Sequence, residues 1–415
     1  MRQREKAVNL MLVFIAGIAL AIVVFGSLPP LAYGKDVQQE YLSALALRDG
    51  LDIFTPTTNL SARYFPVETN NFPHPNPHPP LLSLLAMPLT LLPFPAIVLL
   101  LLALNVVALL TIGRWLGLST QASLALSAWP PIWYTLFIGQ YEILILAMLM
   151  LGWRLASEEQ DTRAGMWLGI SAIMKFYPAL LLLPFLARGR FRLVFVAGAV
   201  FLAGQIGNLL TVGPAGLMRY FAQVLPEVSG KYVQMGLNSA PYGALLRLFG
   251  GATDATPVFN RPEAALPIAI ILSIGALVAL AILRPEAGPV ALLVAMPSAW
   301  SYYTVLALPL VVDLMRHRET RYWAIAATVG ASYVLPLVNM TMETTMAFVH
   351  RASGTAPPIA SVLAAIQPAG HLWLLSLAAI TAVLAWRGFP LSRATWAQSV
   401  DQDAHSHHAQ NGGVG

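Results

Sequence analysis

Long apolar runs recur along this chain, separated by short stretches that are polar or rich in Pro and Gly. A helix needs about 20 predominantly apolar residues to cross a bilayer, so this pattern is typical of a polytopic α-helical membrane protein. The runs predict an all-α protein with about 12 transmembrane helices and with interfacial helices in its outer loops. We expect the first run, residues 8–28, to be a retained span, because it is long and lacks a convincing cleavage site.

The composition agrees with this interpretation. Of the 415 residues, 57% are hydrophobic and only 10% are charged, whereas a soluble domain has about 25% charged residues. Soluble enzymes are therefore excluded for the whole chain. Cysteine is absent, which excludes disulfides, thiolate metal sites and cysteine nucleophiles. The net charge of +5 reflects the excess of basic residues in cytoplasmic loops and does not indicate nucleic-acid binding.

Basic residues predict the orientation, because short loops rich in Lys and Arg stay in the cytoplasm. The N-terminus carries Arg2, Arg4 and Lys6, so both termini are predicted to be cytoplasmic. We predict one transmembrane domain over residues 1–388, with outer loops at 31–94, 213–263 and 342–370, and a disordered cytoplasmic tail at 389–415. The segment 79–92 either spans or lies in the outer interface; we favour the interface, because it leaves Arg114 on the cytoplasmic side.

Ionisable side chains in or beside a membrane are costly and need a reason. Asp36 and Glu40 follow the first span and share one helix face. They can supply a general base or a metal ligand, or they can simply begin a solvated helix. Lys175 interrupts an apolar stretch just before Pro178, where it either extends to the interface or pairs with an anionic ligand.

Other polar and aromatic positions are predicted on the same outer side. His74 and His78 lie in a Pro-rich segment and can bind a sugar hydroxyl or a phosphate, or merely form a rigid turn. Gln140 lies in a tight turn that is followed by the unusual acid Glu142. The remaining candidates are Asn238, Trp300, Tyr302 and Tyr303, of which the last three can also serve as aromatic anchors at the interface.

Taken in order, these features resemble glycosyltransferase family 87, a member of the GT-C group that includes mannosyltransferases dependent on polyprenyl-phosphate-mannose. The matching positions are Asp36 with Tyr41, His78-Pro79-Pro80-Leu81, Gly139-Gln140, Gly165-x3-Gly169 through Lys175-Phe-Tyr-Pro178, Asn238-Ser239 and Ser298-Ala-Trp300. The chain departs from the family pattern where Tyr302 and Tyr303 replace a frequent His, so a catalytic Asp/His pair is not carried over.

The resemblance implies an inverting transferase that acts on the extracytoplasmic face of the plasma (inner) membrane. It implies a polyprenyl-phosphate-linked sugar as donor, with mannose or another hexose or pentose, and a lipid or cell-envelope glycan as acceptor. Asp36 is then the general base, and no cofactor is required, although Asp36 with Glu40 offers a weak case for Mg²⁺. Lys175, Tyr41, His78 and Gln140 are assigned to the donor and its phosphate, and Glu40, Asn238, Trp300, Tyr302 and Tyr303 to the sugar or acceptor.

Two other classes remain open at the level of the sequence. A transporter or flippase for a lipid-linked or anionic solute can also use Lys175 and Glu142 in a polar cavity, although the chain shows no internal repeat. A structural subunit is the third possibility and needs no outer carboxylate.

Overall fold

The computed structural model describes residues 2–28, 35–65, 73–233, 238, 240–252, 257–282, 288–296 and 298–316. Over these residues the fold is helical, and the single β-type contact is an isolated bridge between Asn238 and Trp300. The first eight helices are α1 Arg2–Phe25, α2 Val37–Arg48, α3 Thr57–Tyr64, α4 Pro80–Ala86, α5 Phe94–Trp115, α6 Thr120–Ala125, α7 Pro130–Ile138 and α8 Glu142–Ser157. The others are α9 Asp161–Met174, α10 Leu183–Ala187, α11 Phe191–Arg219, α12 Leu225–Tyr232, α13 Pro241–Phe249, α14 Ala265–Ile282, α15 Gly288–Ala295 and α16 Leu308–Arg316.

Four stretches of helix in the described part of the chain are long and apolar enough to cross a membrane. They are Lys6–Phe25 in α1, Phe94–Trp115 (α5), Phe191–Tyr232 in α11 and α12, and Pro262–Ile282 around α14. The pair α7 and α8 adds a fifth span if its two helices, bent by 119° at the break between them, count as one. The prediction of a polytopic helical membrane protein therefore agrees with the structure.

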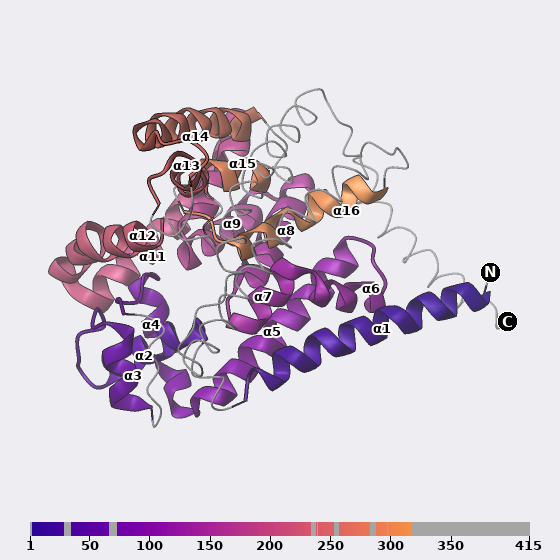
Figure 1. Cartoon of the computed structure of the whole chain (residues 1–415), viewed down its shortest axis with the longest axis horizontal. Helices are drawn as coiled ribbons and strands as arrows, with labels where there is room; N and C mark the ends of the chain where they lie inside the picture. Colours follow the sequence, from indigo (N-terminus) through magenta and orange to yellow (C-terminus); the bar gives the residue numbers. More distant parts are fainter. Residues whose placement is uncertain are drawn as a thin grey trace.

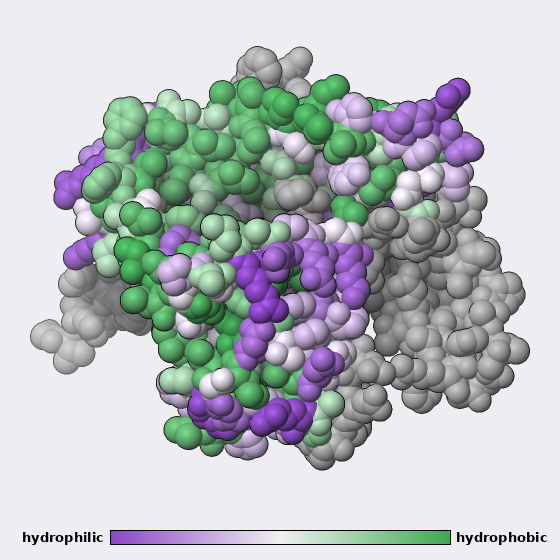
Figure 2. Space-filling model, turned by 90° about the vertical axis from the view of Figure 1, so that its left-hand side faces the viewer, coloured by the Kyte–Doolittle hydropathy of each residue, from purple (hydrophilic) through white to green (hydrophobic). Residues whose placement is uncertain are grey.

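Large apolar side chains lie exposed on the candidate spans. Examples are Phe14 on α1, Val107 on α5, Phe195 on α11 and Ile271 on α14. Figure 2, which views the end of the molecule where α2 to α4 lie, shows broad hydrophobic surfaces interrupted by smaller polar patches. Water would disfavour such surfaces, whereas lipid chains match them, so these helix faces suit a bilayer.

Two glycines on α9 allow it to approach α11 closely. Gly165 and Gly169 lie one turn apart on α9, and a Cβ added to either would come within 2.5 Å of the Leu193 carbonyl or 2.8 Å of the Ala197 carbonyl on α11. Small residues spaced in this way allow two membrane helices to approach at backbone distance. The Gly165-x3-Gly169 motif therefore serves to pack α9 against α11.

The segment after α1 folds into short helices and not into a span. Helices α2, α3 and α4 lie together at one end of the molecule, near α11 and α12 (Figure 1). The apolar stretch Pro80–Leu91, which contains α4 and a 3-10 helix over Met87–Leu91, is 12 residues long by these bounds. Because a span needs about 20 residues, this length supports the interfacial alternative for residues 79–92.

The predicted count of about 12 spans is not confirmed. Several apolar runs form helices that are broken or short, because the chain turns at Gly139, at Lys175 and, with a positive φ of 72° inside α11, at Gly213. The last of these breaks coincides with the predicted start of the outer loop 213–263. The predicted spans beyond residue 316, the outer loop 342–370 and the tail 389–415 lie outside the described residues.

Candidate active site

Asp36 lies at the N-terminus of α2 and is fastened to the end of α7. Its backbone N–H donates to the carbonyl of Ile138 over 2.7 Å. The neighbouring Lys35 donates through Nζ to the carbonyl of Phe137 and lies 4.5 Å from the centre of that ring. Because the last carbonyls of a helix lack partners within it, α7 offers acceptors at this point. Two consecutive residues thus fix the Asp36 backbone against α7.

Opposite Asp36, the turn between α7 and α8 brings Gln140 into position. Gly139 adopts a left-handed conformation with φ of 74°, which other residues rarely tolerate. A Cβ on Gly139 would also lie 3.0 Å from Val37 Cγ1. On the other side, buried Asn105 of α5 donates from Nδ2 to the Gln140 carbonyl over 2.9 Å. The turn is therefore held both by its glycine and by a polar side chain from a candidate span.

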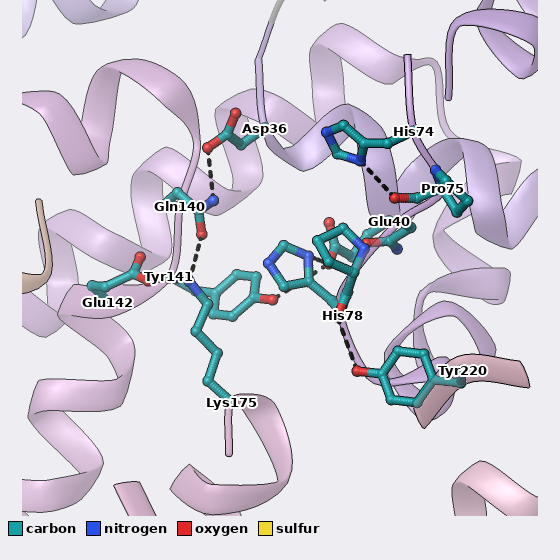
Figure 3. Close-up of polar contacts among 12 residues, drawn as sticks. Asp36, Glu40, His74, Pro75, His78, Gln140, Tyr141, Glu142, Lys175 and Tyr220 are labelled. Carbon is teal, nitrogen blue, oxygen red and sulfur yellow. Dashed lines mark hydrogen bonds and ion pairs between the residues drawn. The ribbon is translucent and has the colours of Figure 1, made fainter. Parts of the chain in front are cut away.

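A chain of polar contacts joins four residues predicted from the sequence to be notable (Figure 3). Gln140 Nε2 donates to Asp36 Oδ2 over 2.7 Å, and Gln140 Oε1 accepts from Lys175 Nζ over 3.0 Å. Lys175 also forms an ion pair with Glu142 Oε1. Glu142 is fully buried and Lys175 is only 6% exposed. Residues distant in the sequence, from the starts of α2 and α8 and from the end of α9, thus meet in one buried cluster.

Aromatic rings surround the Lys175 ammonium. Its Nζ lies 4.9 Å from the ring centre of Tyr141, 4.8 Å from that of Tyr303 and 5.6 Å from that of Tyr302. Tyr177 packs against Tyr303 with ring centres 5.0 Å apart. Cation–π attraction strengthens when water is excluded. Glu142, Gln140 and the rings together stabilise a positive charge that burial alone would disfavour.

A second pair, Glu40 and His78, adjoins this cluster through Tyr141. His78 Nδ1 contacts Glu40 Oε1, and Tyr141 donates to the same oxygen over 3.3 Å. The rings of His78 and Tyr141 lie 5.4 Å apart, so Tyr141 separates His78 from Lys175 (Figure 3). The backbone N–H of His78 donates to Asn76 Oδ1 over 3.0 Å, which fixes the Pro-rich segment. A carboxylate on Nδ1 orients an imidazole and leaves Nε2 for another partner.

Burial changes the pKa values of Asp36 and Lys35 in this site. It raises the pKa of Asp36 from its ordinary value of 3.8 to about 6, against the opposing effects of the Gln140 hydrogen bond and of nearby His78 and Lys175. Burial likewise lowers the pKa of Lys35 to about 8, with Asp36 acting against it. A carboxyl with a pKa close to neutral can accept and release a proton at physiological pH.

Asn238 fixes the loop that carries the aromatic residues. Its Oδ1 accepts from the backbone N–H groups of Ala240 and Ala299, both over 3.0 Å. Trp300, next to Ala299, stacks on Tyr302 with ring centres 6.4 Å apart and also contacts Tyr232 at 5.7 Å. Asn238 therefore binds the backbone of the loop at Ala299, and this contact helps to fix the positions of Trp300 and Tyr302.

Two other predicted residues, Tyr41 and His74, have contacts of a different kind. Tyr41 packs on Phe65 and Phe94, with ring centres 6.3 and 5.2 Å away, and its hydroxyl donates to the Leu92 carbonyl over 2.8 Å. His74 is buried and bonds through Nδ1 to the Pro75 carbonyl, 2.7 Å away. The structure thus gives Tyr41 aromatic packing and gives His74 a backbone hydrogen bond.

Tyr141 and Asn105 belong to the cluster but escaped the sequence prediction. Tyr141 directly follows Gln140, so its position beside Gln140 in the polar turn was the signal that could have identified it. Asn105 interrupts the apolar run of α5, and a polar residue in such a run is unusual enough to be noticed. The described residues contain no group of three or more His, Asp or Glu side chains arranged to hold a metal ion.

A buried cluster of this kind, in a helical protein with lipid-compatible faces, defines a membrane protein with an enclosed polar site. The sequence profile of Glycosyltransferase family 87 matches residues 77–309, more than half of the chain, and the protein belongs to this family. The match includes His78, Gln140, Lys175 and Trp300, and it begins after Asp36 and Glu40.

One characterised relative is a polyprenol-phosphate-mannose-dependent alpha-(1-2)-phosphatidylinositol pentamannoside mannosyltransferase of Mycolicibacterium smegmatis (strain ATCC 700084 / mc(2)155). It is 27% identical over 274 residues, which cover 60% of this chain and 63% of the relative. The alignment thus spans less than two thirds of the relative's length. No solved structure matches the chain.

Proposed function

We propose that this protein transfers a sugar from a polyprenyl-phosphate donor to a lipid or cell-envelope glycan acceptor. Mannose is the first candidate, because the M. smegmatis relative is named as dependent on polyprenol-phosphate-mannose. The observation that carries the proposal is the half-buried carboxylate of Asp36, aligned by Gln140, within a chain of glycosyltransferase family 87.

Asp36 acts as the general base in this reaction. It accepts the proton of the acceptor hydroxyl while that oxygen attacks the anomeric carbon of the sugar. The new C–O bond forms as the bond from the anomeric carbon to the phosphate oxygen breaks on the opposite side, which inverts the configuration. Polyprenyl phosphate leaves with the bonding electrons and needs no proton. The pKa of about 6 keeps Asp36 ionised at neutral pH and still basic enough to take the proton.

His78 and Gln140 serve the donor phosphate. Glu40 occupies Nδ1 of His78, so Nε2 is the nitrogen that donates to a phosphate oxygen when the ring carries both protons. Gln140 lies between the base and the positive charge of Lys175, where a leaving phosphate gains most from nearby dipoles and cations. Tyr41 and Lys175 were assigned to the same task from the sequence; Tyr41 supports the helices that carry the site, and Lys175 has the role argued below.

Trp300 and Tyr302 form the sugar-facing side. Their stacked rings offer flat apolar surfaces, which suit the C–H faces of a hexose. Tyr303 completes this side, and Asn238 holds the loop in place. Glu40 acts indirectly, because its carboxylate is engaged by His78 and Tyr141.

The proposed setting is the plasma membrane, with both termini in the cytoplasm and the site on the extracytoplasmic face. A lipid-linked donor suits that face, because a membrane anchor presents the sugar at the interface without a soluble nucleotide sugar. The transfer as written uses no metal ion, so we expect EDTA to leave activity unchanged.

Reconstitution tests the proposal directly. The purified protein in liposomes receives a radiolabelled, short-chain polyprenyl-phosphate-mannose and a mixture of phosphatidylinositol mannosides as acceptor. We expect label to move into glycolipid, and Asp36→Asn to reduce the rate by about 10²–10⁴-fold at a normal folded yield. Movement of intact donor between leaflets, with no new glycosidic bond, would contradict the transferase and favour a flippase.

A further inference from the structure

The Lys175–Glu142 ion pair lies next to Gln140 in the cluster, and Lys175 forms a hydrogen bond with the Gln140 side chain. Lys175 is 6% exposed, and its ammonium faces Glu142, Gln140 and the rings of Tyr141 and Tyr303. We infer that Lys175 and Glu142 are positioning residues, which act through the Gln140 side chain to orient the Asp36 carboxylate and to set its proton affinity. This inference rests on the proposed function, in which Asp36 is the base.

The first step concerns the orientation of the Gln140 amide. Its two ends differ, because Oε1 only accepts hydrogen bonds and Nε2 only donates them. An ammonium only donates, so Lys175 requires the oxygen on its side, at the observed 3.0 Å. The NH₂ end then faces Asp36 Oδ2, at 2.7 Å. Lys175 thereby selects the one amide orientation that stabilises an ionised Asp36.

The second step concerns Glu142. A lone ammonium in this buried place would be strongly disfavoured, and the carboxylate of Glu142 balances its charge. The pair as a whole is neutral, so it orients Gln140 without adding a full positive charge beside the base. Individually its members act in opposite directions, because Lys175 lowers the pKa of Asp36 and Glu142 raises it.

The third step is that Gln140 has little freedom to relax. Asn105 holds its backbone carbonyl, and Gly139 fixes the turn before it. A change at Lys175 is therefore transmitted to the Asp36 contact and is not absorbed by movement of the turn. The groups that act electrostatically on Asp36 are the basic side chains Lys35, His78 and Lys175, the acidic side chain Glu142, and the tyrosines Tyr134, Tyr232, Tyr302 and Tyr303.

The test is the pH dependence of kcat/KM for transfer, measured in single variants of the pair. On the acid limb of this profile, kcat/KM falls as Asp36 becomes protonated. We expect Lys175→Met to move this limb up by about one pH unit, because the Gln140 amide is no longer held in the orientation that donates to Asp36. We expect Glu142→Gln to move the limb down, because a negative charge near Asp36 is removed. A mere structural defect lowers activity in both variants and does not move the limb in opposite directions.

Two further variants keep the test decisive if Lys175→Met folds poorly. The double variant Lys175→Met/Glu142→Gln leaves no unpaired buried charge and should still move the limb up. Lys175→Arg keeps a donor for Gln140 and should restore the limb in part, because a planar fork does not replace a point charge. The matched control is Asp161→Asn, which removes an ion pair with Arg190 at the opposite end of α9 and should leave the limb unchanged.

Infrared titration of the Asp36 carboxyl supplies a readout that needs no turnover, with the Asp36→Asn spectrum subtracted to assign the band. An unchanged Asp36 titration in all pair variants, together with weakened binding of polyprenyl phosphate, would overturn the inference and return Lys175 to the donor phosphate. The proposed function fails separately, if the wild-type protein transfers no sugar or if Asp36→Asn stays active.

Discussion

Asn105, in the middle of α5, donates from Nδ2 to the backbone carbonyl of Gln140, 2.9 Å away. Its side chain is 1% exposed, and the same Nδ2 also reaches the Leu101 carbonyl of its own helix over 3.1 Å. One polar residue in a candidate span thus connects that span to the turn that carries Gln140. Among the contacts described, no backbone N–H donates to the Gln140 carbonyl, so no other donor there replaces Asn105.

Asn105→Leu should destabilise the protein and slow transfer together. The variant keeps the branched shape of the side chain but leaves the Gln140 carbonyl buried without its donor, which costs about 1–3 kcal/mol. Thermal unfolding in detergent measures the first effect and transfer assays the second. Thr111→Val is the control on the same helix, because the Thr111 hydroxyl bonds only to Val107 one turn earlier. Equal unfolding temperatures for the two variants would contradict this role of Asn105.

Gly165→Ala and Gly169→Ala should each lower the unfolding temperature. The added methyl group meets the Leu193 carbonyl at 2.5 Å or the Ala197 carbonyl at 2.8 Å, so α9 and α11 must separate. Overpacking of this kind costs about 1–3 kcal/mol. Gly198→Ala on α11 is the matched control, because nothing lies within 4 Å of its new methyl group, and a more favourable helix propensity should leave stability equal or higher. Loss of stability in Gly198→Ala alone would refute the packing argument.

Transfer should decline in acid with the titration of Asp36. The base works when ionised, and its pKa is raised to about 6, so activity is full above that pH and lost below it. We expect kcat/KM at pH 5 to be about one tenth of its plateau value, a direct consequence of the ionised fraction of a single general base. Measurements from pH 4.5 to 8 at constant ionic strength check this. An acid limb near pH 4, the ordinary range of an exposed Asp, would show that the pKa of Asp36 is not raised in the working enzyme.

Cysteine labelling tests the orientation cleanly, because the natural chain has no Cys. Ala62→Cys on α3 is an exposed position in the predicted outer loop 31–94. Ser157→Cys at the end of α8 is also exposed, and it lies in a stretch that carries Arg154 and Arg163 and is therefore expected in the cytoplasm. An impermeant maleimide added to intact cells should modify Ala62→Cys and spare Ser157→Cys until the membrane is permeabilised. The reverse pattern would place Asp36 in the cytoplasm and exclude a lipid-linked donor presented from outside.

The sequence by itself determined the class of fold and the residue types of the site. Runs of apolar residues can only be satisfied by lipid or by other helices, so their length predicts membrane helices without any tertiary information. Asp36, Gln140 and Lys175 were visible for a similar reason, because polar residues beside apolar runs are costly and seldom occur without a role. The Gly165-x3-Gly169 spacing was also readable from the sequence, because two glycines four residues apart lie on the same face of a helix.

Only the tertiary structure decided which of these residues meet and what each one does there. Hydropathy does not distinguish a straight span from a helix that bends, so the 119° break at Gly139 and Gln140 and the short Pro80–Leu91 segment changed the expected number of spans. Nor does spacing reveal partners: Lys175 lies 35 residues from Gln140 and 33 from Glu142, and their contact exists because α9 returns along α8. Tyr41 shows the opposite case, since it follows Asp36 closely in sequence but turns towards Phe94. Charge pairing and burial depend on the whole packed arrangement, and for that reason the roles proposed for Lys175, Glu142 and Asn105 follow from the fold and not from the order of residues along the chain.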